Sequence, residues 1–344
     1  MDSEKVKIDI STSTLVRFFL LALFIWLLFT LRGVIAVLLT AVVIASSVDP
    51  AARWFMQYRI PRVLGVLFIY LSTFSALGFV FYLVAPPLIS DLGAFLTELP
   101  EHISSFEPTN ILSFLPQLPT GLTIVLRDAI MNLDVENLGS ANGFFSAVSG
   151  IFGGAISFIL IIVISFYLSV EEKGIENFLK IAIPKEYEGY AIDLWERSRR
   201  KIGFWLQGQL LLGVLIGILV FLGLTIVGVK YALLLALLAG ILEIIPVFGP
   251  IIAAIPAIGV GFLGSPMLGL STLILFVIVQ QFENHLIYPL VIRKTIGIPP
   301  ILVILSLFIG STLAGFFGIL LAVPVATVLM EFINDFARKR QIEF

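Results

Sequence analysis

Apolar residues run through this chain in long stretches that short polar segments separate. The stretches fill residues 15–48, 63–85, 144–170, 203–228, 231–262, 267–288 and 301–331. A helix needs about 20 consecutive apolar residues to cross the hydrocarbon core of a bilayer. The pattern therefore predicts an all-α integral membrane protein with about eight membrane segments, because only closed barrels and helices satisfy their backbone in lipid.

The first apolar stretch, residues 15–48, is too long for one straight span and is interrupted only by Arg32 and Gly33. Two short spans that turn at Arg32–Gly33 fit the bilayer better than one helix that overshoots it. We therefore expect a hairpin there, followed by a basic loop and a third span. That span should end at Pro86 and Pro87, because proline removes a helical hydrogen bond.

Residues 231–262 are apolar but broken where a simple span would be continuous. A straight helix of this length would be roughly 48 Å long at 1.5 Å per residue, against a hydrocarbon core of about 30 Å. Pro246, Gly249, Pro250 and Pro256 interrupt it, and Glu243 lies in its middle. Irregular backbone is tolerated at membrane depth only inside protein or along a wet cavity. We interpret the stretch as a re-entrant hairpin whose tip helps to form a transport site.

A second stretch, residues 301–331, is also too long and is interrupted by Gly310, Gly315, Gly318 and Pro324. If both broken stretches crossed the membrane, Arg293 and Lys294 would lie outside. If both are hairpins, these cations and the C-terminal basic residues all fall inside. Residues 207–331 then form two halves of opposite orientation, and such inverted repeats with paired broken helices mark midplane binding sites in secondary transporters.

The polar segments divide the chain into five parts. We assign residues 1–85 to N-terminal spans, and residues 86–143, which are acidic, to an extracytoplasmic amphipathic helical segment. Residues 144–206 form the fourth span and a basic amphipathic helix, which the positive-inside rule places in the cytoplasm. The last two parts are a transport core at residues 207–336 and a tail at residues 337–344, so that both termini are cytoplasmic.

Composition narrows the function further. Hydrophobic residues make up 59% and charged residues 13% of the chain, with a formal net charge of −2 and no cysteine. Nothing indicates nucleic-acid binding, and disulfides and thiolate sites are excluded. The chain has no HExxH, Walker or GxSxG motif, so we expect neither an enzyme nor a primary pump, and no cofactor or bound metal.

Glu243 is the strongest candidate for function, because an acid inside an apolar stretch commonly couples protons or cations. Its alternative role is that of a structural acid that caps the broken backbone. Glu283 and Asn284 could line the same cavity, or could meet headgroups at the end of a span. Pro246, Gly249 and Pro250 should shape the tip, where freed carbonyls could bind a cation.

Neutral polar side chains form a second group of candidates. The amides of Gln207, Gln209, Gln280 and Gln281 suit a polar solute, although they could instead hydrogen-bond between helices. Ser306 and Thr312 are weaker candidates, because hydroxyls often bond back to their own helix. We place all of these residues on the substrate or ion pathway.

Four successive segments resemble signatures of one known family. They are KIGFWLQGQLLLG, ALLLALLAGILEIIPVFGPIIAAIPA, QQFENHLIYPLVI and GIPPILVILSLFIGSTLAGFFGILLAVPVA. In this order they are similar to the autoinducer-2 exporter family of permeases, and the resemblance covers nearly the whole chain. It implies a homo-pentamer that moves substrate by an elevator-like displacement. His285 departs from the family pattern, so no family role is carried onto it.

We therefore expect a multi-pass secondary transporter in a bacterial or archaeal cell (inner) membrane, in contact with the lipid bilayer. Its cargo is a small polar solute, with autoinducer-2 as the solute that the resemblance implies, and its coupling ion is H+ or Na+. A monovalent cation/proton antiporter on the same scaffold is the first alternative. A passive oligomeric pore or membrane scaffold is an alternative of another class.

Overall fold

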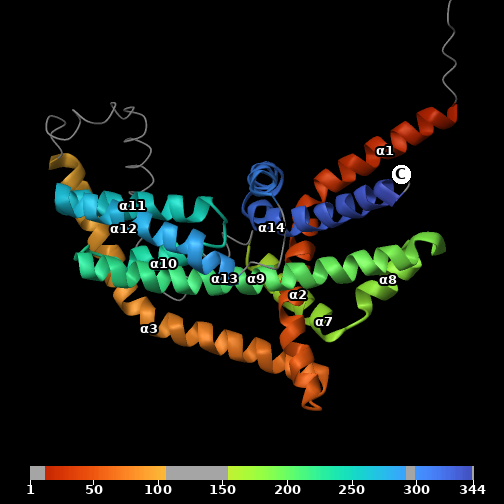
Figure 1. Ribbon diagram of the computed structural model, residues 1–344, viewed down its shortest axis with the longest axis horizontal. Coiled ribbons are helices and arrows are strands. Elements are labelled where there is room, and N and C mark those ends of the chain that lie inside the picture. The colour runs from red at the N-terminus through yellow and green to blue at the C-terminus, as the bar shows by residue number, and fades with distance from the viewer. Residues whose placement is uncertain (1–11, 106–153, 292–298, 343–344) are drawn as a thin grey trace, which may run out of the picture.

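The computed structural model describes residues 12–105, 154–291 and 299–342 (Figure 1). This part of the chain is helical and contains no strand, which confirms the all-α class. Its elements are α1 (Thr12–Thr30), α2 (Arg32–Gln57), α3 (Arg62–Ser105), α7 (Ala155–Val170), α8 (Gly174–Ala182), α9 (Lys185–Val227), α10 (Ala232–Leu242), α11 (Phe248–Gly264), α12 (Pro266–Phe282), the π-helix η1 (Glu283–Ile287), α13 (Tyr288–Val291) and α14 (Pro300–Ile342).

Five of these helices are long and apolar enough to cross a membrane: α2, the first part of α3, α9, the run from α12 to α13, and α14. The apolar parts of α1, α7, α10 and α11 are shorter, with 10–17 residues each. The chain is thus a multi-pass membrane protein. About eight segments were expected, whereas the described residues contain five helices of spanning length.

The expected hairpin at Arg32–Gly33 is wrong. The Leu31 amide donates to the Leu27 carbonyl at 2.9 Å, and the Ile35 amide donates to the Leu31 carbonyl at 2.9 Å. Helical hydrogen bonds therefore continue through the junction, so α1 and α2 meet at a bend instead of a turn. Figure 1 shows α1 extending outward on the same side of the molecule as the C-terminal end of α14, and its large apolar side chains are exposed.

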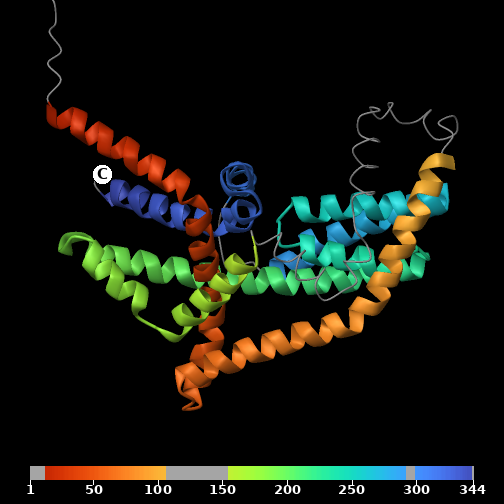
Figure 2. The ribbon, with the colours of Figure 1, turned by 180° about the vertical axis from the view of Figure 1, so that it is seen from behind.

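Helix α3 does not end at Pro86 and Pro87 but continues to Ser105. Proline removes one hydrogen bond and pushes against the preceding turn, and a long helix can absorb this as a kink. Figure 2 shows that α3 bends part-way along its length. The amphipathic pattern that starts at Leu88 is thus part of α3, whereas the rest of the segment to residue 143, and the start of the fourth span, lie outside the described residues.

The basic amphipathic helix and the fifth span form one continuous helix, α9, of 43 residues. No proline or strained residue separates its polar first part from its apolar second part, so nothing in the sequence stops the helix between them. The helix ends at Gly228, whose φ of 83° is a left-handed conformation that glycine adopts readily.

Residues 231–262 form a broken helical pair, as expected. Helix α10 packs along α9, the helix is interrupted from Glu243 to Val247, and α11 then runs back beside α10 (Figure 1). Helix α12 packs along α11 in turn. We call α10, the interruption and α11 the first hairpin.

Residues 301–331 also fold back on themselves, within α14. Ala314 (φ −140°, ψ 20°) and Gly315 (φ 56°, ψ −129°) are not helical. A Cβ on Gly310 would lie 2.2 Å from the Gly318 carbonyl oxygen, so the two arms touch through their backbones. We call this the second hairpin. Gly310, Gly318 and Pro324 were expected to interrupt the helix, but only Ala314–Gly315 breaks it. Residues 292–298, with Arg293 and Lys294, lie outside the described part.

Two hydrophobic cores are arranged along α9. The first joins the second half of α9 to α10, α11 and α12, around Leu224, Ala239 and Ala257. The second joins Ile202, Trp205 and Leu206 of α9 to α2 and the second hairpin. The interruption of the first hairpin begins at Glu243, which lies against α9 beside Gly213.

Candidate functional site

The interruption at residues 243–247 is a sequence of tight turns. The Ile245 amide donates to the Leu242 carbonyl at 2.9 Å, and the Phe248 amide donates to the Pro246 carbonyl at 2.8 Å. The second bond closes a γ-turn around Val247, whose φ of 70° is unusual for a β-branched residue. Strained backbone of this kind persists only where the surroundings hold it, and it gathers at functional sites.

Glycines allow the close packing around this turn. A Cβ on Gly249 would lie 2.0 Å from the Leu242 carbonyl oxygen. A Cβ on Gly213 of α9 would lie 2.6 Å from the Gly240 carbonyl oxygen, and one on Gly240 would lie 2.7 Å from the Gly213 carbonyl oxygen. The backbones of α9 and α10 are therefore in direct contact, which brings Glu243 against α9.

Glu243 and Gln209 are both almost completely buried, with 1% and 2% of their surface exposed. The Gln209 side-chain amide donates to the backbone carbonyl of Glu243. This bond satisfies the Glu243 carbonyl, which the interruption leaves without a partner in its own helix. The Glu243 Oε2 atom and the Gln209 Oε1 atom have no hydrogen-bond partner among the described residues.

The π-helix η1 begins at Glu283 and brings a second carboxyl to the same place. Glu283 is 6% exposed, and its carboxyl lies close enough to that of Glu243 for the two groups to interact. The Gln280 side-chain amide also donates to Glu283 Oε2 at 3.1 Å. One extra residue per turn distinguishes a π-helix from an α-helix, and such segments recur at functional sites.

Two ionised carboxylates repel each other at short distance, and the repulsion between Glu243 and Glu283 is relieved when one of them takes up a proton. The pair can therefore hold one proton between two acids that cannot both be ionised at close range. The unpartnered oxygen atoms of Glu243 and Gln209 add acceptors of the kind that alkali and other hard cations bind. We call Gln209, Glu243, Gln280 and Glu283 the carboxyl site.

The structure places the other candidates elsewhere or in structural roles. Gly249 and Pro250 are buried and Pro246 is half-buried at the turn. Gln207 donates to the Ser47 carbonyl at 2.6 Å and thus bonds between helices.

Asn284 is exposed and accepts a hydrogen bond from Gln280 at 3.4 Å, and Gln281 is exposed. Ser306 and Thr312 donate to carbonyls of their own helix, at 2.6 and 2.8 Å.

Sequence reasoning missed a buried ionic cluster around Asp49. Its Oδ1 accepts from Arg62 at 2.6 Å and from Arg199 at 2.7 Å, and its Oδ2 accepts from Arg53 at 2.8 Å. Arg62 also donates to the Ser169 carbonyl at 2.7 Å. The cluster joins α2, α3, α7 and α9. The signal was an acid directly after an apolar run, whereas Glu243 stood out because it lies inside one.

A second ionic cluster joins α9 to the end of α14. Arg197 donates to Asp335 at 2.6 and 3.2 Å and to Glu331 at 2.9 Å, and Lys201 pairs with Glu331. These partners are far apart in the sequence, so no spacing in the chain predicts them.

Comparison with known proteins connects this geometry to transport. Residues 16–338 match the sequence profile of the AI-2E family transporters. The Bacillus subtilis proteins YueF and YrrI are 29% and 28% identical over 84% and 92% of this chain, which are 80% and 89% of their own lengths. PerM of Escherichia coli is 24% identical over 90% of this chain and 89% of its own length. All three are named provisionally, the first two as transport proteins and PerM as a permease.

Proposed function

Because this chain belongs to the family of AI-2E transporters, we propose that it is a secondary transporter coupled to protons through the carboxyl site. The carboxyl pair of Glu243 and Glu283 carries the proposal. The pair is buried, its two carboxyl groups interact, and it lies where the first hairpin is interrupted. Intramembrane acids with such partners are typical of proton relays in transporters.

The cargo in this proposal is a small polar solute, and autoinducer-2 is the first solute to test. Gln209 and Gln280 supply neutral hydrogen-bonding groups next to the acids, as recognition of a polar molecule requires. In this proposal both hairpins are re-entrant and related as an inverted repeat. An elevator-like displacement, a homo-pentameric assembly and an inner-membrane location with cytoplasmic termini are expected from the resemblance to the family.

A monovalent cation/proton antiporter is a second candidate, which a specific observation favours. The unpartnered atoms of the carboxyl site are oxygens, Glu243 Oε2 and Gln209 Oε1. Oxygen ligands are those that hard cations prefer. In this mechanism Na+ or K+ would replace the shared proton and leave when the pair is protonated again.

The test is flux in proteoliposomes under an imposed pH gradient, with labelled autoinducer-2, Na+ or K+ as the cargo. We expect saturable flux that follows the gradient. Glu243→Gln removes the titratable group but keeps a hydrogen-bonding amide, and should reduce gradient-driven flux by roughly 5- to 150-fold, the usual range for coupling between two ligands.

Glu283→Gln should act in the same direction, because either change leaves only one acid in the pair. The matched control is Glu186→Gln, an exposed acid on α9, which should leave flux unchanged. Flux that ignores the pH gradient in wild type and in Glu243→Gln alike would exclude the coupling role. Steady single-channel currents would favour a passive pore instead.

A further inference from the structure

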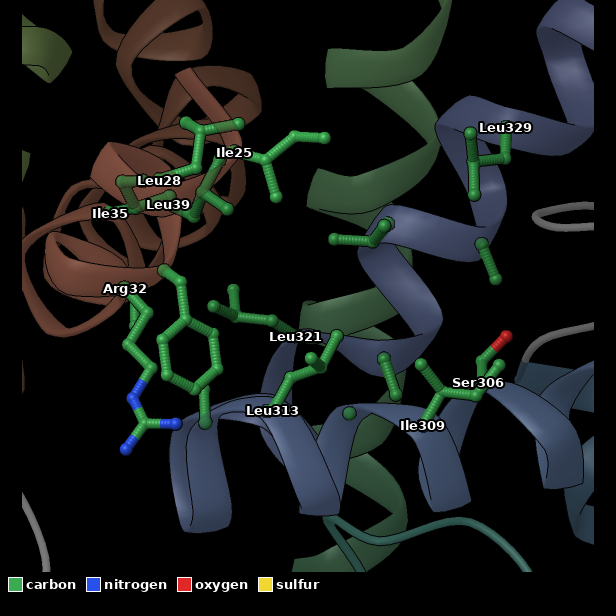
Figure 3. Close-up of a pocket in the computed structure, with 18 residues that line it drawn as sticks. Ile25, Leu28, Arg32, Ile35, Leu39, Ser306, Ile309, Leu313, Leu321 and Leu329 are labelled. Atoms are coloured by element: carbon green, nitrogen blue, oxygen red, sulfur yellow. The ribbon is translucent and has the colours of Figure 1, made fainter. Parts of the chain in front are cut away.

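A groove of about 530 Å³ lies between the α1–α2 bend and the second hairpin of α14. Figure 3 shows Leu28, Ile35 and Leu39 on one side of it and Ile309 and Leu321 on the other. Sites for small molecules have volumes of about 300–1,000 Å³. The groove therefore has the size of a ligand site, and it is separate from the carboxyl site.

The lining of the groove is almost entirely apolar. Only Arg32 and Ser306 among its residues carry polar side chains. The Ser306 hydroxyl donates to the Leu302 carbonyl at 2.6 Å, so its hydrogen is already used within its own helix. The interior thus suits a hydrocarbon chain, and the guanidinium of Arg32 is the one charged group among the described residues that line the groove.

Arg32 has no anionic partner in the part of the chain that the structure describes. Its guanidinium lies 4.5 Å from the centre of the Phe29 ring, a cation–π contact that orients it without neutralising it. The side chain is exposed. An arginine in this position favours a phosphate, which its planar donors match geometrically.

In a bilayer that α2 crosses, Arg32 lies at the level of the lipid headgroups. Arg32 is the first residue of this 26-residue candidate span, and the Asp49 cluster lies near the other end. The helix between Arg32 and Arg53 is about 32 Å long at 1.5 Å per residue, close to the hydrocarbon thickness of about 30 Å. Ile35 and Leu39, one and two turns further along α2, lie at increasing depth.

From this geometry we propose that the groove binds an anionic phospholipid, with an acyl chain between α2 and the second hairpin and the phosphate at Arg32. One phospholipid molecule supplies both the acyl chain for the apolar groove and the phosphate for Arg32 at its edge. A second copy of this chain would have to bring a carboxylate to Arg32 as well as an apolar segment into the groove. The site does not depend on the proposed transport function.

The experiment measures lipid binding to the purified full chain in detergent, with phosphatidylglycerol and phosphatidylcholine of equal chain length as probes. Native mass spectrometry counts bound lipids, and the thermal unfolding midpoint reports stabilisation. The wild-type protein should bind phosphatidylglycerol more tightly than phosphatidylcholine. Arg32→Gln should weaken this binding by about tenfold, the value of one hydrogen bond to a charged group.

Two control pairs separate the groove from general lipid effects. Arg17→Gln changes an exposed arginine on α1 that does not line the groove, and should leave the preference intact. Val325→Phe fills the groove and should remove bound lipid, whereas Val277→Phe, at an exposed site on α12, should not.

The proposal is overturned if Arg32→Gln binds phosphatidylglycerol like wild type, or if both lipids bind equally well. It is also overturned if a photoreactive residue in place of Leu313 crosslinks to a second copy of the chain in membranes and not to lipid. Crosslinking to lipid that is lost in Val325→Phe supports it.

Discussion

Gly249 is the residue on which the tip of the first hairpin most clearly depends. We expect Gly249→Ala to destabilise the protein by about 3 kcal/mol or more, because the added Cβ would lie 2.0 Å from the Leu242 carbonyl oxygen and the backbone there must move. The measurement is the free energy of unfolding in detergent, together with flux in proteoliposomes.

The matched control is Gly259→Ala on the same helix, α11. A Cβ at Gly259 meets nothing within 4 Å, so the change should be neutral or stabilise the helix by up to about 1 kcal/mol. Equal effects of the two substitutions would show that the close approach at Gly249 is absent from the protein.

Asp49 holds buried charges together, and its substitution tests the cluster that the sequence did not reveal. Asp49 is 8% and Arg199 is 9% exposed. Asp49→Asn leaves Arg199 buried without its counter-charge, and should cost about 3–5 kcal/mol of unfolding free energy. Asp193→Asn is the control, because Asp193 is 63% exposed in its pair with Arg197, and should cost less than about 1 kcal/mol.

The carboxyl site was partly predictable at this scale. Glu243, Gln209 and Glu283 stood out because polar groups are costly in apolar runs and persist there only with partners. For Glu283 the sequence left two readings open, a cavity shared with Glu243 and the end of a span, because the choice depends on contact between α9 and α10 and on the π-helix at Glu283. No residue pattern announces a π-helix, and Val247 gives no sign in the sequence of its positive φ.

At the scale of elements, the two hairpins were predictable and their limits were not. Glycine and proline marked residues 231–262 and 301–331 as broken, and both fold back. The break in α14 lies at Ala314–Gly315, because Gly310 and Gly318 serve close approach of the arms instead. Pro86 and Pro87 did not end α3, although proline was expected to stop that helix. Helix α9 continues past its polar first part because no residue there favours a helix end.

The contact between α9 and the end of α14 gives a prediction for pH. Arg197 donates two hydrogen bonds to the Asp335 carboxylate, so the ionised group stabilises the fold above about pH 4, near the ordinary pKa of an aspartate. That contribution is lost as the carboxylate takes up a proton at lower pH. Asp335→Asn should therefore be less stable than wild type by about 1 kcal/mol at pH 7.

This difference should shrink as the pH falls below about 4, where wild type also loses the charge. Thermal unfolding midpoints of the two proteins between pH 3 and pH 7 provide the measurement. Glu186→Gln reports the effect of neutralising an exposed acid elsewhere on α9. A difference that stays constant over the whole range contradicts the assigned role of Asp335.

At the scale of the whole molecule, the re-entrant path of the first hairpin can be tested by labelling. The sequence contains no cysteine, so single cysteines at Val247 and Phe248 are specific reporters. Both side chains are exposed at the turn, by 48% and 40%. We expect a membrane-impermeant maleimide to label them from one side of sealed vesicles only.

A cysteine in place of Glu186, in the polar half of α9, fixes the orientation of the vesicles. Equal labelling of residues 247 and 248 from both sides, or none from either, contradicts a re-entrant tip that faces a cavity. The sequence predicted the helical membrane class at this scale. It could not predict the packing of α14 on α2, which joins segments far apart in the chain.

Helix α9 is one unbroken rod of 43 residues that passes through both hydrophobic cores. The two cores can change their relative angle only if this rod flexes or unwinds between Leu206 and Ile216. That interval contains Gln209 and Gly213, the residues that touch Glu243 and the backbone of α10. Any change in the angle between the two cores must therefore deform α9 beside the buried acids. In the proposed mechanism a proton at Glu243 would thus act on the helix segment that connects the two cores.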